Sequence, residues 1–223
     1  SGEGDKYMNL FEDKGYDEET RRYLSKLKIT DDSLGVLLDS LQNEGILDDT
    51  VIVMYGDHYP YGLSKEDVSK IVSYDVNLYN DIEKTPFVIY NSKLSAKVFE
   101  DKTSYINLLP TLANLFDLDY DARFYMGEDI LSEDYSGRVV FTNSSWMDDV
   151  AFYDALNSKI TYLSGETYTT EEIKKINQTI YNKKEMSRLA ITTNYFDYLE
   201  KALKEREEAQ NEETNDRGIT SQE

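Results

Sequence analysis

The sequence lacks several residue types on which common functional sites depend. Of its 223 residues, none is cysteine and only one is histidine. Without cysteine the chain can form no disulfide, zinc–thiolate site or iron–sulfur cluster, and it has no cysteine nucleophile. Any chemistry that needs a histidine of this chain must therefore use His58.

Long apolar runs and the common nucleotide and hydrolase motifs are missing too. No apolar stretch approaches the roughly 20 residues of a membrane helix, and no P-loop, glycine-rich dinucleotide fingerprint, H-E-x-x-H or G-x-S-x-G motif occurs. The chain shows no signal peptide and begins Ser1-Gly2-Glu3 without an initiator methionine. We therefore expect it to be an excised part of a longer protein.

Positive charge is scarce as well. There are 24 Lys and Arg against 44 Asp and Glu, a formal net charge of −20. Such a surface repels polyanions, so nucleic acid is not expected as a partner. With 39% hydrophobic residues, 13% of the chain being aromatic, the sequence is too apolar for a wholly disordered protein. Its length suits one α/β domain with an appendage.

Alternating helical and extended patterns predict an α/β fold. A helix over 17–28 is followed by a second helix, which Asp31 or Asp32 would cap and which ends near Gly45. The uninterrupted run 51–55 is typical of a strand buried on both faces. The later predicted elements are helices over 64–73 and 104–116 and strands over 87–90, 138–142 and 160–163. The polar segment 143–149, which holds the only Trp, is interpreted as a surface loop.

The last quarter of the chain has a different pattern. Thr169 and Glu172 form a capping-box signature before a long helical pattern, with a break near 192–193. From about Lys204 onward almost nothing apolar remains, which predicts disorder. We therefore divide the chain into a domain over 1–165, a helical extension over 166–203 and a disordered acidic tail over 204–223.

The residues around His58 are the main candidates for chemistry. Gly56, Asp57 and His58 follow the 51–55 strand directly, and in open α/β sheets ligands bind outside the carboxyl ends of strands. A carboxylate beside an imidazole suits zinc or manganese better than calcium. Two ligands are too few for a complete site. The alternative is an ordinary strand-end histidine next to an aspartate that caps a turn.

Several segments around this motif resemble the lipoteichoic acid synthase family, phosphoglycerol transferases of the sulfatase and alkaline-phosphatase superfamily. The resemblance extends over about residues 17–142. It is carried by Tyr23-Leu24, Asp32-Ser33-Leu34-Gly35, Leu41, Gly45-Ile46-Leu47-Asp48-Asp49-Thr50-Val51-Ile52-Val53-Met54-Tyr55-Gly56-Asp57-His58-Tyr59, Thr85-Pro86-Phe87-Val88-Ile89-Tyr90, Ile106-Asn107-Leu108-Leu109-Pro110-Thr111-Leu112-Ala113-Asn114-Leu115-Phe116 and Gly127-Glu128-Asp129-Ile130-Leu131. It implies the C-terminal half of an extracellular catalytic domain, with a mostly parallel sheet flanked by helices.

The resemblance also implies a mechanism. In this family a Thr nucleophile attacks the phosphodiester of a phosphatidylglycerol head group beside a divalent ion, usually Mn²⁺, with Zn²⁺ or Mg²⁺ as alternatives. The phosphoglycerol group then passes to a growing glycerophosphate polymer. Asp57 and His58 match the metal ligands of the Gly-Asp-His motif, and Tyr59 and Tyr61 are candidates for the glycerol pocket.

The family's nucleophile and first acidic metal ligand belong to its N-terminal half. No Thr of this chain matches the nucleophile motif, so we assign no catalytic residue here and expect the chain alone to be inactive. Its expected partners are that N-terminal half, the lipid head group and the polymer. Its expected location is the outer face of a bacterial membrane, with N-terminal membrane helices as the anchor.

Two other functions stay open. One is a different hydrolase of the superfamily, a sulfatase or phosphodiesterase, which the upstream nucleophile would distinguish. The other is a binding module that kept the fold and lost catalysis. Glu3 motivates the second, because it stands where a Ser-Gly-His segment of the family would place a substrate-binding histidine.

Overall fold

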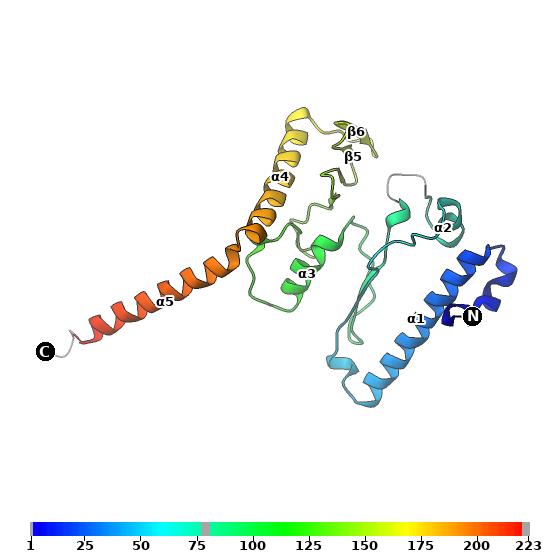
Figure 1. The fold of residues 1–223 in the computed structure, drawn as a ribbon, viewed down its shortest axis with the longest axis horizontal. Helices are drawn as coiled ribbons and strands as arrows, with labels where there is room; N and C mark the ends of the chain where they lie inside the picture. The colour runs from blue at the N-terminus through cyan, green and yellow to red at the C-terminus, as the bar shows by residue number, and fades with distance from the viewer. Residues whose placement is uncertain (1, 77–80, 220–223) are drawn as a thin grey trace. The chain divides into compact units, whose positions relative to one another are not determined.

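The computed structural model describes residues 2–76 and 81–219. The chain divides into two compact units, Ser1–Lys97 and Val98–Glu223, which are coloured blue to green and green to red in Figure 1. Both combine helices with β-strands, so the predicted α/β class is confirmed.

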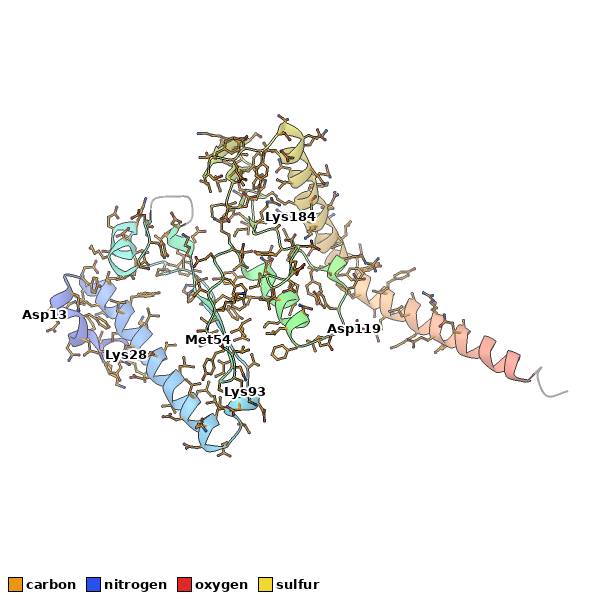
Figure 2. All side chains as sticks on the ribbon, turned by 180° about the vertical axis from the view of Figure 1, so that it is seen from behind. Asp13, Lys28, Met54, Lys93, Asp119 and Lys184 are labelled. Atoms are coloured by element: carbon orange, nitrogen blue, oxygen red, sulfur yellow. The ribbon has the colours of Figure 1, made fainter. Side chains whose placement is uncertain are left out.

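The first unit is dominated by one long helix, α1 (Glu18–Asn43). The carboxylate of Asp17 caps it by accepting a hydrogen bond from the backbone N–H of Thr20. The prediction of two helices was wrong, because Asp31 and Asp32 lie inside α1 and do not cap a new helix. Their carboxylates bind the Lys28 ammonium, each at 2.7 Å, and Figure 2 labels Lys28 on this helix.

The end of α1 follows the prediction. Gly45 lies two residues beyond the helix with φ = 72°, a left-handed conformation that glycine adopts without strain. The shorter helices of this unit are η1 (Glu3–Asp5), η2 (Met8–Lys14), η3 (Leu47–Asp49), α2 (Lys65–Ile71) and η4 (Asp81–Glu83). Ser64 and Asp67 form a capping box at the start of α2.

The two strands of the first unit are β1 (Ile52–Tyr55), on which Figure 2 labels Met54, and β2 (Phe87–Tyr90). Both were predicted, but they pair antiparallel, with Tyr55 opposite Phe87, whereas a mostly parallel sheet was expected. The connection over 56–86 returns to the end of β1 from which it left. The N–H of Gly56 donates to the carbonyl of Pro86 at 3.2 Å, so the chain doubles back without crossing the sheet.

The sequence predicted that β1 and β2 are buried on both faces, and this prediction was wrong for the described residues. Both strands are only half-buried, and the Tyr55 and Val88 side chains are exposed. The apolar core of the unit lies instead around α2, where Leu63, Val68 and Val76 pack with Tyr23 of α1. The sequences of β1 and β2 thus carry more apolar surface than the described residues cover.

In the second unit the 104–116 prediction corresponds to η5 (Tyr105–Asn107) followed by α3 (Leu108–Leu115). Pro110 lies in the first turn of α3, where a missing backbone N–H costs little. The proline therefore marks the start of the regular helix. A further short helix, η6 (Ala122–Phe124), follows.

A four-stranded antiparallel meander comes next, formed by β3 (Val139–Val140), β4 (Trp146–Met147), β5 (Ala151–Asp154) and β6 (Lys159–Tyr162). The prediction of a surface loop over 143–149 was wrong. Trp146 is completely buried and packs with Ala151 of β5 and Ile180. The polar residues around it misled the prediction because their polar groups are satisfied inside the unit.

The C-terminal helices are α4 (Thr170–Thr192) and α5 (Tyr195–Ile219). The predicted capping box of Thr169 and Glu172 is present, and Asn194, with φ = 50°, separates the helices near the predicted break. Residues 204–219 are helical where disorder was predicted, consistent with their many strong helix formers such as Glu, Lys and Arg; residues 220–223 lie outside the described residues. Among the described residues, no helix has the length and apolarity that a membrane crossing requires.

Candidate functional site

The predicted metal-ligand motif lies where β1 ends beside the start of β2. Gly56 leaves β1 opposite Pro86, and a Cβ atom on Gly56 would lie only 3.1 Å from the Cβ atom of Thr85. Any larger side chain would push the two segments apart. Glycine here therefore lets the Gly-Asp-His turn pass directly against the segment that leads into β2.

The side chains of Asp57 and His58 lie next to each other and are accessible to solvent. His58 Nε2 lies 3.6 Å from Asp57 Oδ1, and the two side chains are 47% and 86% exposed. On the other side of the ring, His58 Nδ1 lies 2.7 Å from the carbonyl oxygen of Tyr59. A carbonyl can only accept, so in the neutral ring Nδ1 carries the proton and Nε2 keeps its lone pair. That lone pair is on the side of the Asp57 carboxylate.

This arrangement fits part of a metal site. Two donors bound to one tetrahedral ion through bonds of about 2.1 Å lie about 3.4 Å apart, close to the observed separation. A backbone carbonyl that accepts from the second ring nitrogen is also a common partner of metal-binding histidines. Within residues 2–76 and 81–219, however, no three or more His, Asp or Glu residues are grouped so that they could hold an ion.

The two tyrosines predicted for substrate binding surround the histidine. The rings of His58 and Tyr61 stack with their centroids 4.3 Å apart and an angle of 17° between their planes. Tyr59 contacts Tyr61 edge to face at 4.7 Å. The four predicted site residues thus form one continuous cluster, with Thr85 as a neighbour that the site prediction did not include.

Thr85 could have been found from the sequence. It precedes the predicted 87–90 strand just as Gly56 follows the 51–55 strand. Antiparallel pairing brings those two ends together, whereas the expected parallel pairing separates them. The signal was present, but the wrong pairing direction hid it.

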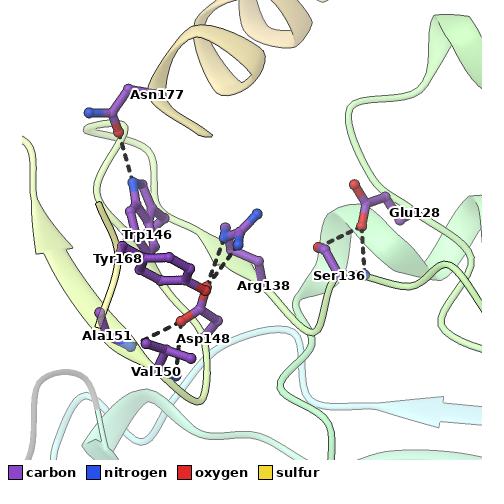
Figure 3. A network of polar contacts seen from close by, with 9 residues as sticks. All are labelled: Glu128, Ser136, Arg138, Trp146, Asp148, Val150, Ala151, Tyr168 and Asn177. Atoms are coloured by element: carbon purple, nitrogen blue, oxygen red, sulfur yellow. Dashed lines mark hydrogen bonds and ion pairs between the residues drawn. The ribbon is translucent and has the colours of Figure 1, made fainter. Parts of the chain in front are cut away.

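The second unit holds a polar cluster that the sequence prediction missed (Figure 3). Asp148 is buried, and its carboxylate accepts from Arg138 Nη2 at 2.8 Å, from the Tyr168 hydroxyl at 2.9 Å and from two backbone N–H groups. The Arg138 guanidinium also lies over the Trp146 ring at 5.1 Å. Burial, followed by the hydrogen bond to Asp148, raises the pKa of the Tyr168 hydroxyl. The cluster is internally satisfied, so it stabilises the meander and offers no free group for chemistry.

A groove of about 300 Å³ lies between α4 and the segment over 126–140. Two of its charged residues are paired, since Lys183 Nζ lies 3.0 Å from Glu128 Oε1, and Ser136 donates to the same carboxylate. Burial raises the pKa of Glu128, but the hydrogen bond from Ser136 and the ion pair with Lys183 outweigh it, so the pKa lies below its usual range. The Glu128 carboxylate is therefore already bound by groups of the chain itself.

Comparisons with known proteins show the family to which the chain belongs. The model of the sulfatase family matches residues 3–118, more than half of the chain. The chain belongs to the sulfatase family. The matched range includes Asp57, His58 and all of α1 to α3, but neither the meander nor α4 and α5.

Within this family, the chain is similar in sequence to lipoteichoic acid synthases. The chain is 27% identical over 151 residues to a lipoteichoic acid synthase of Staphylococcus saprophyticus, covering 66% of this chain and 22% of that protein. It is 25% identical over 171 residues to lipoteichoic acid synthase 2 of Bacillus subtilis, with coverage of 74% and 25%, and 23% identical over 154 residues to a lipoteichoic acid synthase of Staphylococcus aureus, with 67% and 22%. The predicted resemblance is therefore confirmed. The chain spans about a quarter of the length of these relatives.

Proposed function

We propose that this chain is part of a metal-dependent phosphoglycerol transferase that acts on phosphatidylglycerol-type phosphodiesters during synthesis of an anionic cell-envelope polymer. Membership of the sulfatase family and similarity to three lipoteichoic acid synthases support this reaction class. The single observation that carries it is the geometry of Asp57 and His58, whose donor atoms lie 3.6 Å apart with the histidine lone pair on the carboxylate side.

In this proposal Asp57 and His58 hold a divalent ion. Mn²⁺ is the expected ion, and Zn²⁺ and Mg²⁺ are the alternatives. When bound, such an ion polarises phosphoryl oxygens and lowers the pKa of a nearby hydroxyl nucleophile. The Tyr59 carbonyl orients the His58 ring, and the Tyr59 and Tyr61 side chains border the space in which a glycerol moiety would lie. The nucleophile and the remaining ligands come from other segments of the protein.

The apolar surface of the first unit supports a further partner segment. β1 and β2 are continuous apolar strands of the kind that lie inside a sheet, yet they form a two-stranded ribbon with exposed Tyr55 and Val88. A two-stranded ribbon alone is marginally stable. We propose that the N-terminal half of the catalytic domain completes this sheet and its metal site.

The proposed location is the outer face of a bacterial membrane, where phosphatidylglycerol head groups and a growing glycerophosphate polymer are accessible. An anchor outside these residues would hold the catalytic domain there. The net charge of −20 opposes direct binding of the chain to an anionic lipid surface. An anchor would overcome that repulsion.

The test uses the natural gene product that contains this chain, incubated with labelled phosphatidylglycerol and Mn²⁺. We expect Mn²⁺-dependent release of diacylglycerol that falls by at least about 100-fold in His58→Ala, because loss of a group that only orients a metal ligand already costs about 10- to 100-fold. Tyr181→Ala is the control, since this exposed side chain lies in the second unit. Parallel calorimetric titration with Mn²⁺ reports binding separately from turnover.

Three other outcomes would contradict the proposal. Hydrolysis of sulfate esters in place of lipid turnover would identify the protein as a sulfatase. Neither activity, together with no Mn²⁺ binding by the natural protein, would identify a binding module. Micromolar Mn²⁺ binding by the 223-residue chain alone, about −8 kcal/mol, would contradict the statement that the remaining ligands lie in other segments.

A further inference from the structure

Tyr61 has a position that its sequence surroundings do not explain. Its side chain is 67% exposed, yet its ring lies flat on the only imidazole of the chain, at 4.3 Å between centroids. An exposed tyrosine without a partner samples several rotamers and loses side-chain entropy when it is fixed. The stacking contact therefore confines both rings.

The backbone on either side of Tyr61 is held in place. Pro60 fixes its own φ angle, and its carbonyl accepts a hydrogen bond from the N–H of Leu63 at 3.1 Å, closing a turn over residues 60–63. Leu63 is buried in the core with Val68 and Val76. The turn that carries Tyr61 is thus anchored in the apolar core of the first unit.

We propose that Tyr61 is a positioning residue: it holds the His58 ring so that Nδ1–H faces the Tyr59 carbonyl and Nε2 faces Asp57. The proposal deepens the proposed function and, for its metal consequence, rests on it. Tyr61 is not a catalytic residue in this role, since it acts through His58. Tyr59 supports it by packing its edge against the Tyr61 ring at 4.7 Å.

The physical argument concerns rotation of the imidazole. The hydrogen bond from Nδ1 to Tyr59 spans neighbouring residues and leaves the ring half exposed, so water competes for both nitrogens. A ring flip exchanges Nδ1 with Cδ2 and Nε2 with Cε1, so it removes the hydrogen bond to the Tyr59 carbonyl and moves Nε2 away from its present position beside Asp57. Aromatic stacking adds about 0.5–1.5 kcal/mol, enough to shift such an equilibrium by about 2- to 13-fold at 1.36 kcal/mol per factor of ten.

The experiment uses the ¹⁵N NMR spectrum of the His58 ring in the 223-residue chain. Because His58 is the only histidine, its two ring nitrogens are assigned without ambiguity. At a pH of about 9 an imidazole is neutral, and the spectrum separates the protonated from the unprotonated nitrogen. The variants are Tyr61→Ala, Tyr61→Phe, which keeps the ring, and Tyr181→Ala, which removes a comparably exposed tyrosine elsewhere.

We expect one dominant form, protonated at Nδ1, in the wild type, in Tyr61→Phe and in Tyr181→Ala. In Tyr61→Ala we expect the two nitrogens to shift toward averaged values as both tautomers become populated. An unchanged ring spectrum in Tyr61→Ala would overturn the proposal, as would averaged nitrogens in the wild type. Backbone amide spectra check that each variant keeps its fold.

A second measurement separates this proposal from the proposed function. In the natural gene product, Tyr61→Ala should weaken Mn²⁺ binding by about tenfold, as loss of a group that orients a ligand does, while Tyr61→Phe should not. If the wild-type protein binds no Mn²⁺, the metal role of His58 fails, and the ring spectrum still decides whether Tyr61 orients the imidazole.

Discussion

Gly127 is the glycine, among the described residues, at which an added Cβ atom would meet the nearest neighbours. A Cβ atom there would lie 1.8 Å from the Ile106 carbonyl oxygen and 2.8 Å from the Asn107 nitrogen. On the other side, Asn107 Oδ1 accepts the N–H of Glu128 at 2.8 Å. The Glu128–Asn107 hydrogen bond thus accompanies a close approach of this segment to η5, and that approach leaves no room for a side chain at residue 127.

We predict that Gly127→Ala destabilises the second unit by at least about 2 kcal/mol, because the backbone must shift to relieve the overlap. Denaturant unfolding followed by the fluorescence of Trp146, the only Trp, measures this directly. Gly165→Ala is the matched control, since nothing lies within 4 Å of its added methyl group. Equal stability of the two variants would contradict the packing described here.

Asp148 and its neighbour Asp149 offer a second paired test. Asp148→Ala leaves the Arg138 guanidinium and two backbone N–H groups without their acceptor. Breaking a buried ion pair on one side costs about 3–5 kcal/mol, and we expect about 3 kcal/mol here. Asp149→Ala removes only an exposed carboxylate that binds Lys102 and should cost at most about 1 kcal/mol. A similar cost for both variants would show that the Asp148 network does not stabilise the meander.

At the scale of elements, several side-chain contacts attach α4 to the rest of the second unit, and two of them differ in their response to pH. Trp146 Nε1–H donates to Asn177 at 2.8 Å, and Lys183 pairs with Glu128. The first contact is independent of pH in the acid range, whereas the second requires an ionised Glu128. Docking of α4 should therefore weaken when that carboxylate is protonated.

The sign of this pH effect follows from the lowered pKa of Glu128 in the folded state. Its contribution to stability is complete above about pH 4.3, the usual value for a glutamate, and is lost as the pH falls through the lower folded-state pKa. The stability difference between wild type and Glu128→Gln should shrink between about pH 5 and pH 3. Trp146 fluorescence is the measurement and Glu133→Gln, an exposed carboxylate, the control. A difference that is constant over this range would refute the assignment.

Local signals in the sequence predicted several elements well. The capping box at Thr169, the left-handed Gly45 and the runs 51–55 and 87–90 depend on contacts close in sequence, and all four are present. One miss is also local, because Lys28 binds Asp31 and Asp32 three and four residues away within one helix. The other misses depend on more distant partners. The sequence does not show that Arg138 makes a buried position possible for Asp148. Strand direction failed for the same reason.

In the candidate site, too, the residues that are close in sequence were predicted and the contact with a distant segment was not. Asp57, His58, Tyr59 and Tyr61 are neighbours in sequence, and they cluster in the structure. The contact of Gly56 with Thr85 follows from the antiparallel pairing of β1 and β2, whereas a mostly parallel sheet was expected. The stacking of Tyr61 on His58 forms between residues three apart, but residue types alone do not specify such side-chain geometry.

At the scale of the whole molecule, the strongly negative charge complicates any test of a cation site. A chain with a net charge of −20 attracts divalent ions to many carboxylates, so weak binding alone proves little. A specific site must affect its own ligands first. The single histidine makes that distinction measurable.

Substoichiometric Mn²⁺ added to the 223-residue chain shows whether Asp57 and His58 bind a shared divalent ion, as we propose. Because Mn²⁺ is paramagnetic, it broadens the NMR signals of nearby nuclei even when binding is weak. We predict that the His58 ring signals broaden first, that Asp57→Asn reduces the effect, and that Asp49→Asn, a change at an exposed carboxylate of the same unit, does not. Broadening spread evenly over the acidic surface, with His58 no more affected than other residues, would contradict the account.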